Sequence, residues 1–135
     1  MTNGERADRL FAEAGSVAGE MRRALADQAW NLATRRAQEV MELVVKGLLN
    51  EMGTEYPRVH DAVPVLIATL EQRRLQADGE FLEWLRAFSS RLAELRAPVF
   101  YQEIQRTEAA ARSDVEGAER VLAFGRDLLA RLRRP

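Results

Sequence analysis

The amino-acid sequence predicts an all-α protein, an up-and-down bundle of four to five helices. In most of the chain, apolar residues recur every three or four positions, which is the period of one helix face. One of these segments is apolar nearly all round, as expected for a helix at the centre of a bundle. No segment alternates in the way that is typical of strands. Because 135 residues suit one hydrophobic core, we expect a single domain over residues 1–135.

The central helix is predicted between Asp27 and Gly53. Asp27 is a suitable N-cap, because its carboxylate can accept from free N–H groups of the first turn. Gly53 suits the position after the helix, where the backbone often takes a positive φ. Apolar residues cover one face of this segment and spread onto the others, so other helices should surround it. The main face consists of Trp30, Ala33, Ala37, Val40, Met41, Val44, Leu48 and Met52.

The flanking helices have the same apolar period. The first is expected from about Glu5 to Leu25, and its Gly15 and Gly19 either admit a closely packed neighbour or mark a break. The third is expected to start with Asp61 as its N-cap and to end near Arg74. Pro64 then falls in the first turn, where its missing N–H costs nothing.

Two further helices complete the predicted bundle. The fourth should begin near Glu80 and end near Arg96, because Pro98 follows. Residues 97–112 are the least regular part, with room for a short helical turn and an Ala-rich end that joins the last helix. The fifth helix should start at Ser113, which forms a capping box with Glu116, and should run to about residue 132.

Composition excludes several classes of function. The chain is 47% hydrophobic and 30% charged, with a net charge of −1, which is typical of a soluble globular protein and unlike a general nucleic-acid binder. No apolar run approaches the roughly 20 residues that span a bilayer. The first ten residues carry no signal-peptide pattern, so we expect a cytoplasmic protein. The chain has no cysteine and one histidine, and the sequence therefore predicts no metal site and no cofactor.

The segment AQEVMELVVKGLL, a short loop and the segment YPRVHDAVPVL together resemble the HEPN (higher eukaryotes and prokaryotes nucleotide-binding) domain. That family usually has a helix with a Glu-x-x-x-Lys pair, a loop, and a His-Asp at the start of the next helix. Glu42, Lys46, His60 and Asp61 occupy these positions here. The resemblance spans roughly residues 7–132 and implies a bundle of the kind that the apolar pattern predicts.

The later segment FSSRLAELRAPVFY is similar to the second half of the family, where an Arg and a Tyr follow the fourth helix. Arg91, Arg96 and Tyr101 come from this segment, and helix packing as in HEPN domains would bring Arg96 and Tyr101 near His60. A guanidinium and a phenol suit a phosphate and a nucleobase. The alternative is that Tyr101 packs at the end of the bundle, with its hydroxyl bonded to backbone.

These arguments give a set of candidate ligand-binding residues: Lys46, Arg58, His60, Asp61, Arg96 and Tyr101. His60 lies at a predicted helix start, a natural anion site that Arg58 would strengthen. It can equally cap or pack the loop. Glu42 and Lys46 are four residues apart and can form a ligand site, a buried pair or a plain surface pair.

Four arginines near the start of the central helix and the end of the first form a possible basic surface spot, and they can equally be ordinary solvated side chains. They are Arg22, Arg23, Arg35 and Arg36.

The residues expected of a HEPN ribonuclease are incomplete. Many members cleave RNA without metal through an Arg, four to six residues and a His, in which the Arg steadies phosphate charge and the His transfers a proton. His60 is the only histidine, and the required arginine would stand at positions 53–55, which are Gly, Thr and Glu. Arg58 is too close. The sequence therefore predicts no catalytic residue and argues against ribonuclease activity.

The resemblance implies a non-catalytic HEPN module that binds a nucleotide or RNA and partners a small nucleotidyltransferase, as in toxin–antitoxin-like pairs. It also implies a homodimer, for which an apolar face of the first or fifth helix would serve. One alternative is a degenerate ribonuclease that uses His60 with a distant arginine or one from a second subunit. The other is a helical scaffold that binds a protein by a helix-in-groove contact.

Overall fold

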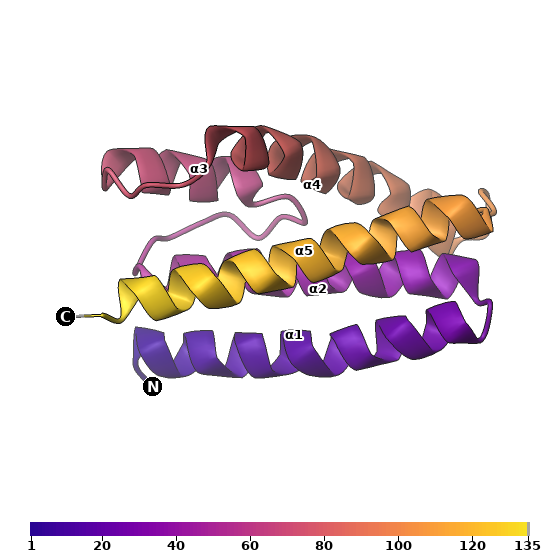
Figure 1. Ribbon diagram of the computed structural model, residues 1–135, viewed down its shortest axis with the longest axis horizontal. Coiled ribbons are helices and arrows are strands. Elements are labelled where there is room, and N and C mark those ends of the chain that lie inside the picture. The colour runs from indigo at the N-terminus through magenta and orange to yellow at the C-terminus, as the bar shows by residue number, and fades with distance from the viewer. Residues whose placement is uncertain (135) are drawn as a thin grey trace.

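The structure is a computed structural model that describes residues 1–134. These residues form five helices and no strand, and the four long helices alternate in direction (Figure 1). The all-α, up-and-down bundle that the sequence predicts is therefore confirmed. The short helix lies antiparallel to the helix that follows it. The helices are α1 (Asn3–Ala26), α2 (Trp30–Glu51), α3 (Val63–Gln72), α4 (Gly79–Phe100) and α5 (Glu108–Leu132).

Helix α2 is the centre of the bundle, as its apolar residues predict. It packs against each of the other four helices, most extensively against α1 and α5. The apolar side chains that it buries match the predicted face closely, and Leu49 and Val45 extend that face. Burial on several sides leaves one stripe of α2 for polar residues, and this stripe faces α4 and the loop before α3.

Glycines let the helices approach closely, but at positions other than those predicted. A Cβ at Gly47 would lie 2.8 Å from the Phe11 ring, and one at Gly125 would lie 2.3 Å from the Val44 side chain. Neither Gly15 nor Gly19 has a neighbouring backbone against it, and α1 runs past both without a break. Both readings offered for those two glycines are therefore wrong, because the close contacts of α1 use its apolar face.

The start of α2 differs from the prediction at Asp27. This residue ends α1, since its N–H donates to the carbonyl of Arg23 at 2.9 Å, and α2 begins at Trp30 without a side-chain cap. Gln28 makes the turn with a φ of +61°, a left-handed conformation that the sequence does not signal. The other end follows the prediction, because Gly53 has a φ of +68°.

The α4–α5 connection also differs from the prediction. Helix α4 continues through Pro98 to Phe100: the proline lacks the N–H that would donate one turn back, and only two helical residues follow it. Helix α5 begins at Glu108, and the hydroxyl of Thr107 caps it by accepting from the N–H of Ala110 at 3.1 Å. Ser113 lies inside this helix and not at its start. The alanines before it favour helix, so the helix extends back to the earlier cap.

An ion-pair cluster joins the two ends of the chain. Arg133, just after α5, lies 2.8 Å from the carboxylate of Asp8 in α1 and 2.7 Å from that of Glu51 in α2. It also donates to the carbonyl of Gly4 at 3.2 Å. The first turn of α1 and the last turn of α5 therefore lie together at one end of the bundle, as Figure 1 shows.

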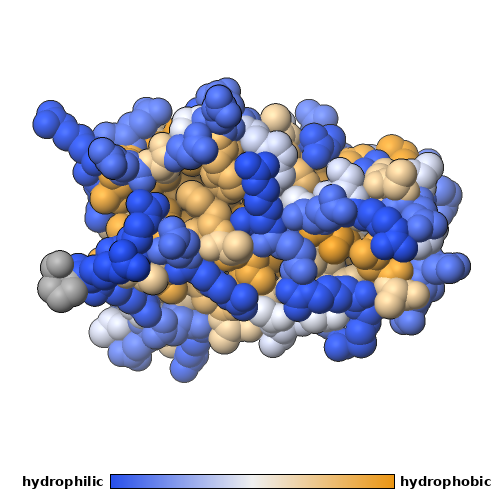
Figure 2. Space-filling view, viewed as in Figure 1, coloured by the Kyte–Doolittle hydropathy of each residue, from blue (hydrophilic) through white to orange (hydrophobic). Residues whose placement is uncertain are grey.

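The surface is mainly polar on the face that Figure 2 shows, with apolar side chains visible in the hollow between the α3–α4 connection and α5. The large apolar side chains that are most exposed on residues 1–134 are Met1, Val59, Phe100, Tyr101 and Ile104. None of them lies on α1 or α5, where an interface was expected. They concentrate at the end of α4 and in the loop after it. No helix within residues 1–134 is long and apolar enough to cross a membrane.

Candidate functional site

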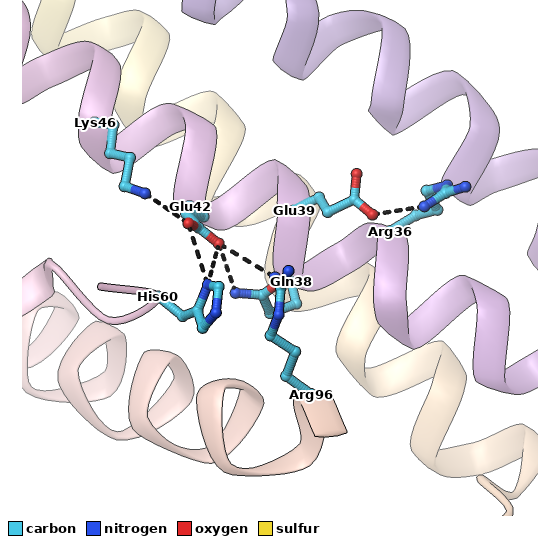
Figure 3. A network of polar contacts seen from close by, with 7 residues as sticks. All are labelled: Arg36, Gln38, Glu39, Glu42, Lys46, His60 and Arg96. Atoms are coloured by element: carbon cyan, nitrogen blue, oxygen red, sulfur yellow. Dashed lines mark hydrogen bonds and ion pairs between the residues drawn. The ribbon is translucent and has the colours of Figure 1, made fainter. Parts of the chain in front are cut away.

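The carboxylate of Glu42 is the centre of a polar cluster on the free stripe of α2 (Figure 3). Its side chain is 16% exposed. Lys46, one turn later, donates to one carboxylate oxygen at 2.6 Å, and Gln38, one turn earlier, donates to the other at 2.9 Å. The predicted Glu42–Lys46 pair therefore forms, and it is a partly buried pair with a third partner.

Two other segments bring nitrogen-bearing side chains to the same carboxylate. His60, in the loop before α3, places Nδ1 3.3 Å from Oε2 and 3.4 Å from Oε1 of Glu42. Arg96, near the end of α4, places Nη1 3.6 Å from Oε2 of Glu42 and 2.9 Å from Oε1 of Gln38. Residues 42, 60 and 96 are far apart in sequence, and the fold gathers them at one point, as Figure 3 shows.

The surroundings of Glu42 keep its carboxylate charged. Burial alone would raise the pKa of the Glu42 carboxyl. Hydrogen bonds from Lys46 and Gln38, together with the positive charges of Lys46 and His60, outweigh burial and hold that pKa below its usual value. At neutral pH Glu42 is therefore a fixed negative charge that orients the donors around it.

The contact with Glu42 also defines how His60 faces its surroundings. A carboxylate can only accept hydrogen bonds, so the neighbouring Nδ1 must carry the hydrogen. This assigns the tautomer from the contact. Nε2 then points away from Glu42, as a lone pair in the neutral ring or as a second N–H in the imidazolium. The imidazole is half exposed, and Nε2 can reach a ligand.

A pocket of about 450 Å³ opens beside this cluster, between the first half of α2 and the second half of α4. Gln38, His60 and Arg96 contribute polar groups to its wall, and Leu92, Leu95 and Val99 contribute apolar ones. The remaining lining residues are Thr34, Arg35, Glu39, Ala93, Ala97, Phe100 and Tyr101.

Aromatic rings and a second arginine form the mouth of the pocket. The guanidinium of Arg35 lies over the Phe100 ring, 4.7 Å from its centroid, as in a cation–π contact. The Tyr101 ring meets Phe100 edge-on, with the ring centroids 5.1 Å apart, and the residue is 69% exposed. The acidic residue at this mouth, Glu39, is already paired with Arg36 at 2.5 Å. The mouth therefore presents positive charge beside exposed aromatic surface.

The predicted ligand-binding residues divide into two groups. His60, Arg96 and Tyr101 line one pocket, as the sequence predicts for residues that act together. Lys46 pairs with Glu42 but does not line the pocket, and Arg58 is exposed outside it. The carboxylate of Asp61 instead accepts from the Ser89 hydroxyl at 2.6 Å and from an N–H in the first turn of α3 at 3.2 Å. Asp61 thus joins α3 to α4.

Sequence reasoning did not assign Gln38, Arg35 or Phe100 to this pocket. Gln38 lies on a helix that was predicted from its apolar residues. No feature of the neighbouring sequence indicates that its amide bonds to Arg96, 58 positions away. Arg35 was assigned to a basic surface spot together with its neighbours. Two of the four arginines of that spot are paired with acids, because Arg22 pairs with Glu119 and Arg36 pairs with Glu39. Phe100 lay in the stretch that was expected to be irregular.

A buried polar network supports the far side of the pocket. Thr34, which lines it, donates to the buried carboxylate of Asp114 at 2.7 Å, and Arg106 donates to the same oxygen at 2.8 Å. Asn31 accepts from the N–H of Arg106 at 2.7 Å and donates to the carbonyl of Ile104 at 2.9 Å. The loop after Tyr101 is therefore fixed to α2 and α5.

The site offers hydrogen-bond donors on Arg96 and His60, and aromatic faces on Phe100 and Tyr101. The carboxylate of Glu42 is its fixed acceptor. Within residues 1–134, no group of three or more His, Cys, Asp or Glu side chains is arranged to hold a metal ion. The basic side chains at the site are suited to bind an anion, and the imidazole can transfer a proton.

Comparison with known proteins gives one match. The family model of the HEPN domain matches residues 7–128, which is most of the chain. Searches of curated proteins and of solved structures returned no match. The matched range contains the Glu42 cluster and both walls of the pocket. The chain therefore belongs to the HEPN domain family.

Proposed function

We propose that this HEPN domain binds a nucleotide in the pocket between α2 and α4. The observation that carries the proposal is the position of Arg96 and His60, which Gln38 and Glu42 hold beside the exposed Tyr101 ring in a single pocket. A nucleotide combines an anionic phosphate with a flat aromatic base, and this site presents a complement to each.

The phosphate would bind at the inner end. Arg96 uses one nitrogen on Gln38, and the other N–H groups of its guanidinium remain available. Arginine forms strong, directed hydrogen bonds to phosphate oxygens. Nε2 of His60 can add a donor when the ring is protonated. Lys46 already pairs with the charge of Glu42, so the positive charge of Arg96 remains available to attract a phosphate.

The base would bind at the mouth. Tyr101 and Phe100 expose aromatic surface there, and aromatic rings stack on nucleobases of any sequence. Arg35, already over the Phe100 ring, can stack in the same way. The pocket of about 450 Å³ lies within the range typical of small-molecule sites, roughly 300–1,000 Å³.

The direct test is isothermal titration calorimetry with adenosine 5′-monophosphate and guanosine 5′-monophosphate. Arg96→Ala should weaken binding by about tenfold or more, since hydrogen bonds to charged groups contribute roughly 1.5–3 kcal/mol. Arg86→Ala is the matched control, because Arg86 is an exposed arginine of the same helix outside the pocket. No binding by the wild type at millimolar nucleotide, or equal losses in both variants, would overturn the proposal.

We propose further that the domain acts as a homodimer and as the partner of a small nucleotidyltransferase, in a toxin–antitoxin-like pair. Phe100, Tyr101 and Ile104 expose apolar surface at and beside the mouth of the pocket, and this surface supports a protein contact there. Native mass spectrometry of the protein isolated gently from its own cells tests both parts. A stoichiometric partner of nucleotidyltransferase size is expected, and a bare monomer would contradict both parts.

One observation favours a second candidate function, a metal-independent ribonuclease. The sequence lacks an Arg at the required distance before His60, yet the fold brings Arg96 and His60 to the same carboxylate. Glu42 orients Nδ1, so Nε2 could exchange a proton with a ribose hydroxyl while Arg96 steadies the phosphate. The family's spacing also recurs from Arg96 to Tyr101, but with a phenol in place of the imidazole.

Cleavage of single-stranded RNA without added metal tests this second candidate. Wild-type cleavage that is lost in His60→Ala and kept in Arg86→Ala would support it. The absence of cleavage by the wild type would exclude it and leave the binding proposal intact.

A further inference from the structure

We infer that Gln38 is a positioning residue that sets the orientation of Arg96 for the phosphate of the ligand. The inference rests on the proposed function, because it assigns a role within that binding pocket. Gln38 would not need to contact the phosphate itself. Its effect would pass through the arginine.

Gln38 is buried and uses both ends of its amide. Only 3% of the residue is exposed. Its Oε1 accepts from Nη1 of Arg96 at 2.9 Å, and its Nε2 donates to Oε2 of Glu42 at 2.9 Å. The two partners fix which end is which, since a guanidinium can only donate and a carboxylate can only accept. The amide therefore has one orientation that satisfies both neighbours.

This arrangement restrains a long side chain that is partly exposed. The Arg96 side chain is 44% exposed, and its nearest carboxylate oxygen, on Glu42, lies at 3.6 Å. The bond to Gln38 is thus its closest polar contact at the site. A long arginine side chain has many rotamers, and restraint before binding removes an ordering cost that the ligand would otherwise have to overcome.

Glu42 makes the chain of contacts continuous from α2 to α4. Lys46 and Gln38 hold its carboxylate from either side along the helix, so its position follows that of α2. Gln38 transmits this fixed position to Arg96. A glutamine at this place can accept from the arginine and donate to the glutamate at once, which an apolar residue of the same size cannot do.

The opposing explanation is that Gln38 only fills space between α2 and α4. That role would make a substitution lower stability and affinity regardless of which side chain stands at position 96. A double-mutant cycle separates the two explanations. Gln38→Met keeps the length and burial of the side chain and removes both hydrogen bonds.

The test uses adenosine 5′-monophosphate and four forms of the full chain: wild type, Gln38→Met, Arg96→Ala and the double variant. Gln38→Met should weaken binding by about three- to tenfold, the range expected for one hydrogen bond. In the Arg96→Ala background it should change affinity by less than about 1.5-fold, because no arginine is left to orient. Equal weakening in both backgrounds would overturn the inference. Thr69→Val, another buried polar substitution outside the pocket, should leave affinity unchanged.

A second measurement does not depend on nucleotide binding. In nitrogen-15 NMR spectra, the guanidinium signal that disappears in Arg96→Ala identifies Arg96. Restrained rotation should keep its Nη groups distinct in the wild type, and Gln38→Met should average them. An unchanged signal in Gln38→Met would overturn the inference. If the wild type binds no nucleotide but the signal averages as expected, the proposed function fails while the positioning of Arg96 stands.

Discussion

The two faces of α2 show how one helix can serve stability and a site at the same time. The face toward α1 and α5 buries Val44 and Leu48 completely, and small residues such as Gly47 let the neighbouring helices come close. The face toward α4 carries Gln38, Glu42 and Lys46 at steps of four residues. The same helical period therefore produces a close-packed apolar contact on one side and a row of polar side chains on the other.

This difference explains why the apolar face can be predicted from the sequence and the distant partners of the polar face cannot. An apolar face needs only residues of suitable size and period, because hydrophobic burial has no direction. A polar face needs partners at specific distances, because hydrogen bonds and ion pairs weaken steeply when misplaced. The partners on the polar face of α2 come from a loop and from α4, so these contacts of that face form only in the folded chain and cannot be read from the sequence of α2.

The largest effect is expected from the apolar face. Leu48→Ala removes a fully buried side chain and should lower the free energy of unfolding by about 2–5 kcal/mol. Urea unfolding monitored by circular dichroism measures this loss. Leu43→Ala, on the same helix but only partly buried, should cost clearly less. Equal losses would show that complete burial does not make Leu48 contribute more to stability than the partly buried Leu43.

The next effect should differ in sign between two glycines. Gly125→Ala would push a methyl group against Val44, and we expect it to destabilise by about 1–2 kcal/mol after the gain in helix propensity. Gly19→Ala meets only the flexible end of Arg23 at 3.9 Å, so it should stabilise α1 by up to about 1 kcal/mol. Thermal unfolding of both variants measures the difference. Stabilisation by both substitutions would contradict the close packing at Gly125.

The smallest effect concerns the polar face and depends on pH. The pKa of Glu42 is lower in the folded chain than in the unfolded one, where about 4.3 is usual. Its contribution to stability is therefore complete above about pH 4.3 and is lost as the pH falls through the folded-state pKa. Glu42→Gln should be less stable than the wild type at neutral pH, and the difference should shrink on acidification. Unfolding free energies from about pH 6 to pH 3 check this, and parallel curves would contradict it.

The sequence was sufficient for the parts of the fold that depend on periodic burial. The central position of α2, the positive φ of Gly53 and the Glu42–Lys46 pair all follow from local spacing. Helix ends were harder, because two caps can compete. Asp27 and Ser113 are both suitable N-caps by residue type. In the structure, however, Asp27 is the C-cap of α1, and α5 starts at Glu108, before Ser113, because Thr107 caps it.

Site residues could be predicted only where the residue type or the surrounding motif was distinctive in the sequence. His60 and Arg96 stood out as the sole histidine and as part of a family-like segment, and they do meet at Glu42. Arg58 looked equally suitable, but it does not line the pocket between α2 and α4, since proximity in sequence does not fix the direction of a loop side chain. Gln38 gave no signal, because its importance lies in a bond to a helix 58 residues away.

The cluster around Arg133 has a consequence for the connectivity of the chain. Because it holds the start of α1 beside the end of α5, a short peptide can link these two points without disturbing the bundle. New ends can then be opened in the exposed turn between α3 and α4, where Arg73, Arg74 and Gln76 lie at the surface. Such a circular permutant should keep the pocket between α2 and α4, since neither wall is cut. The order of the helices along the chain is thus separable from their arrangement in space.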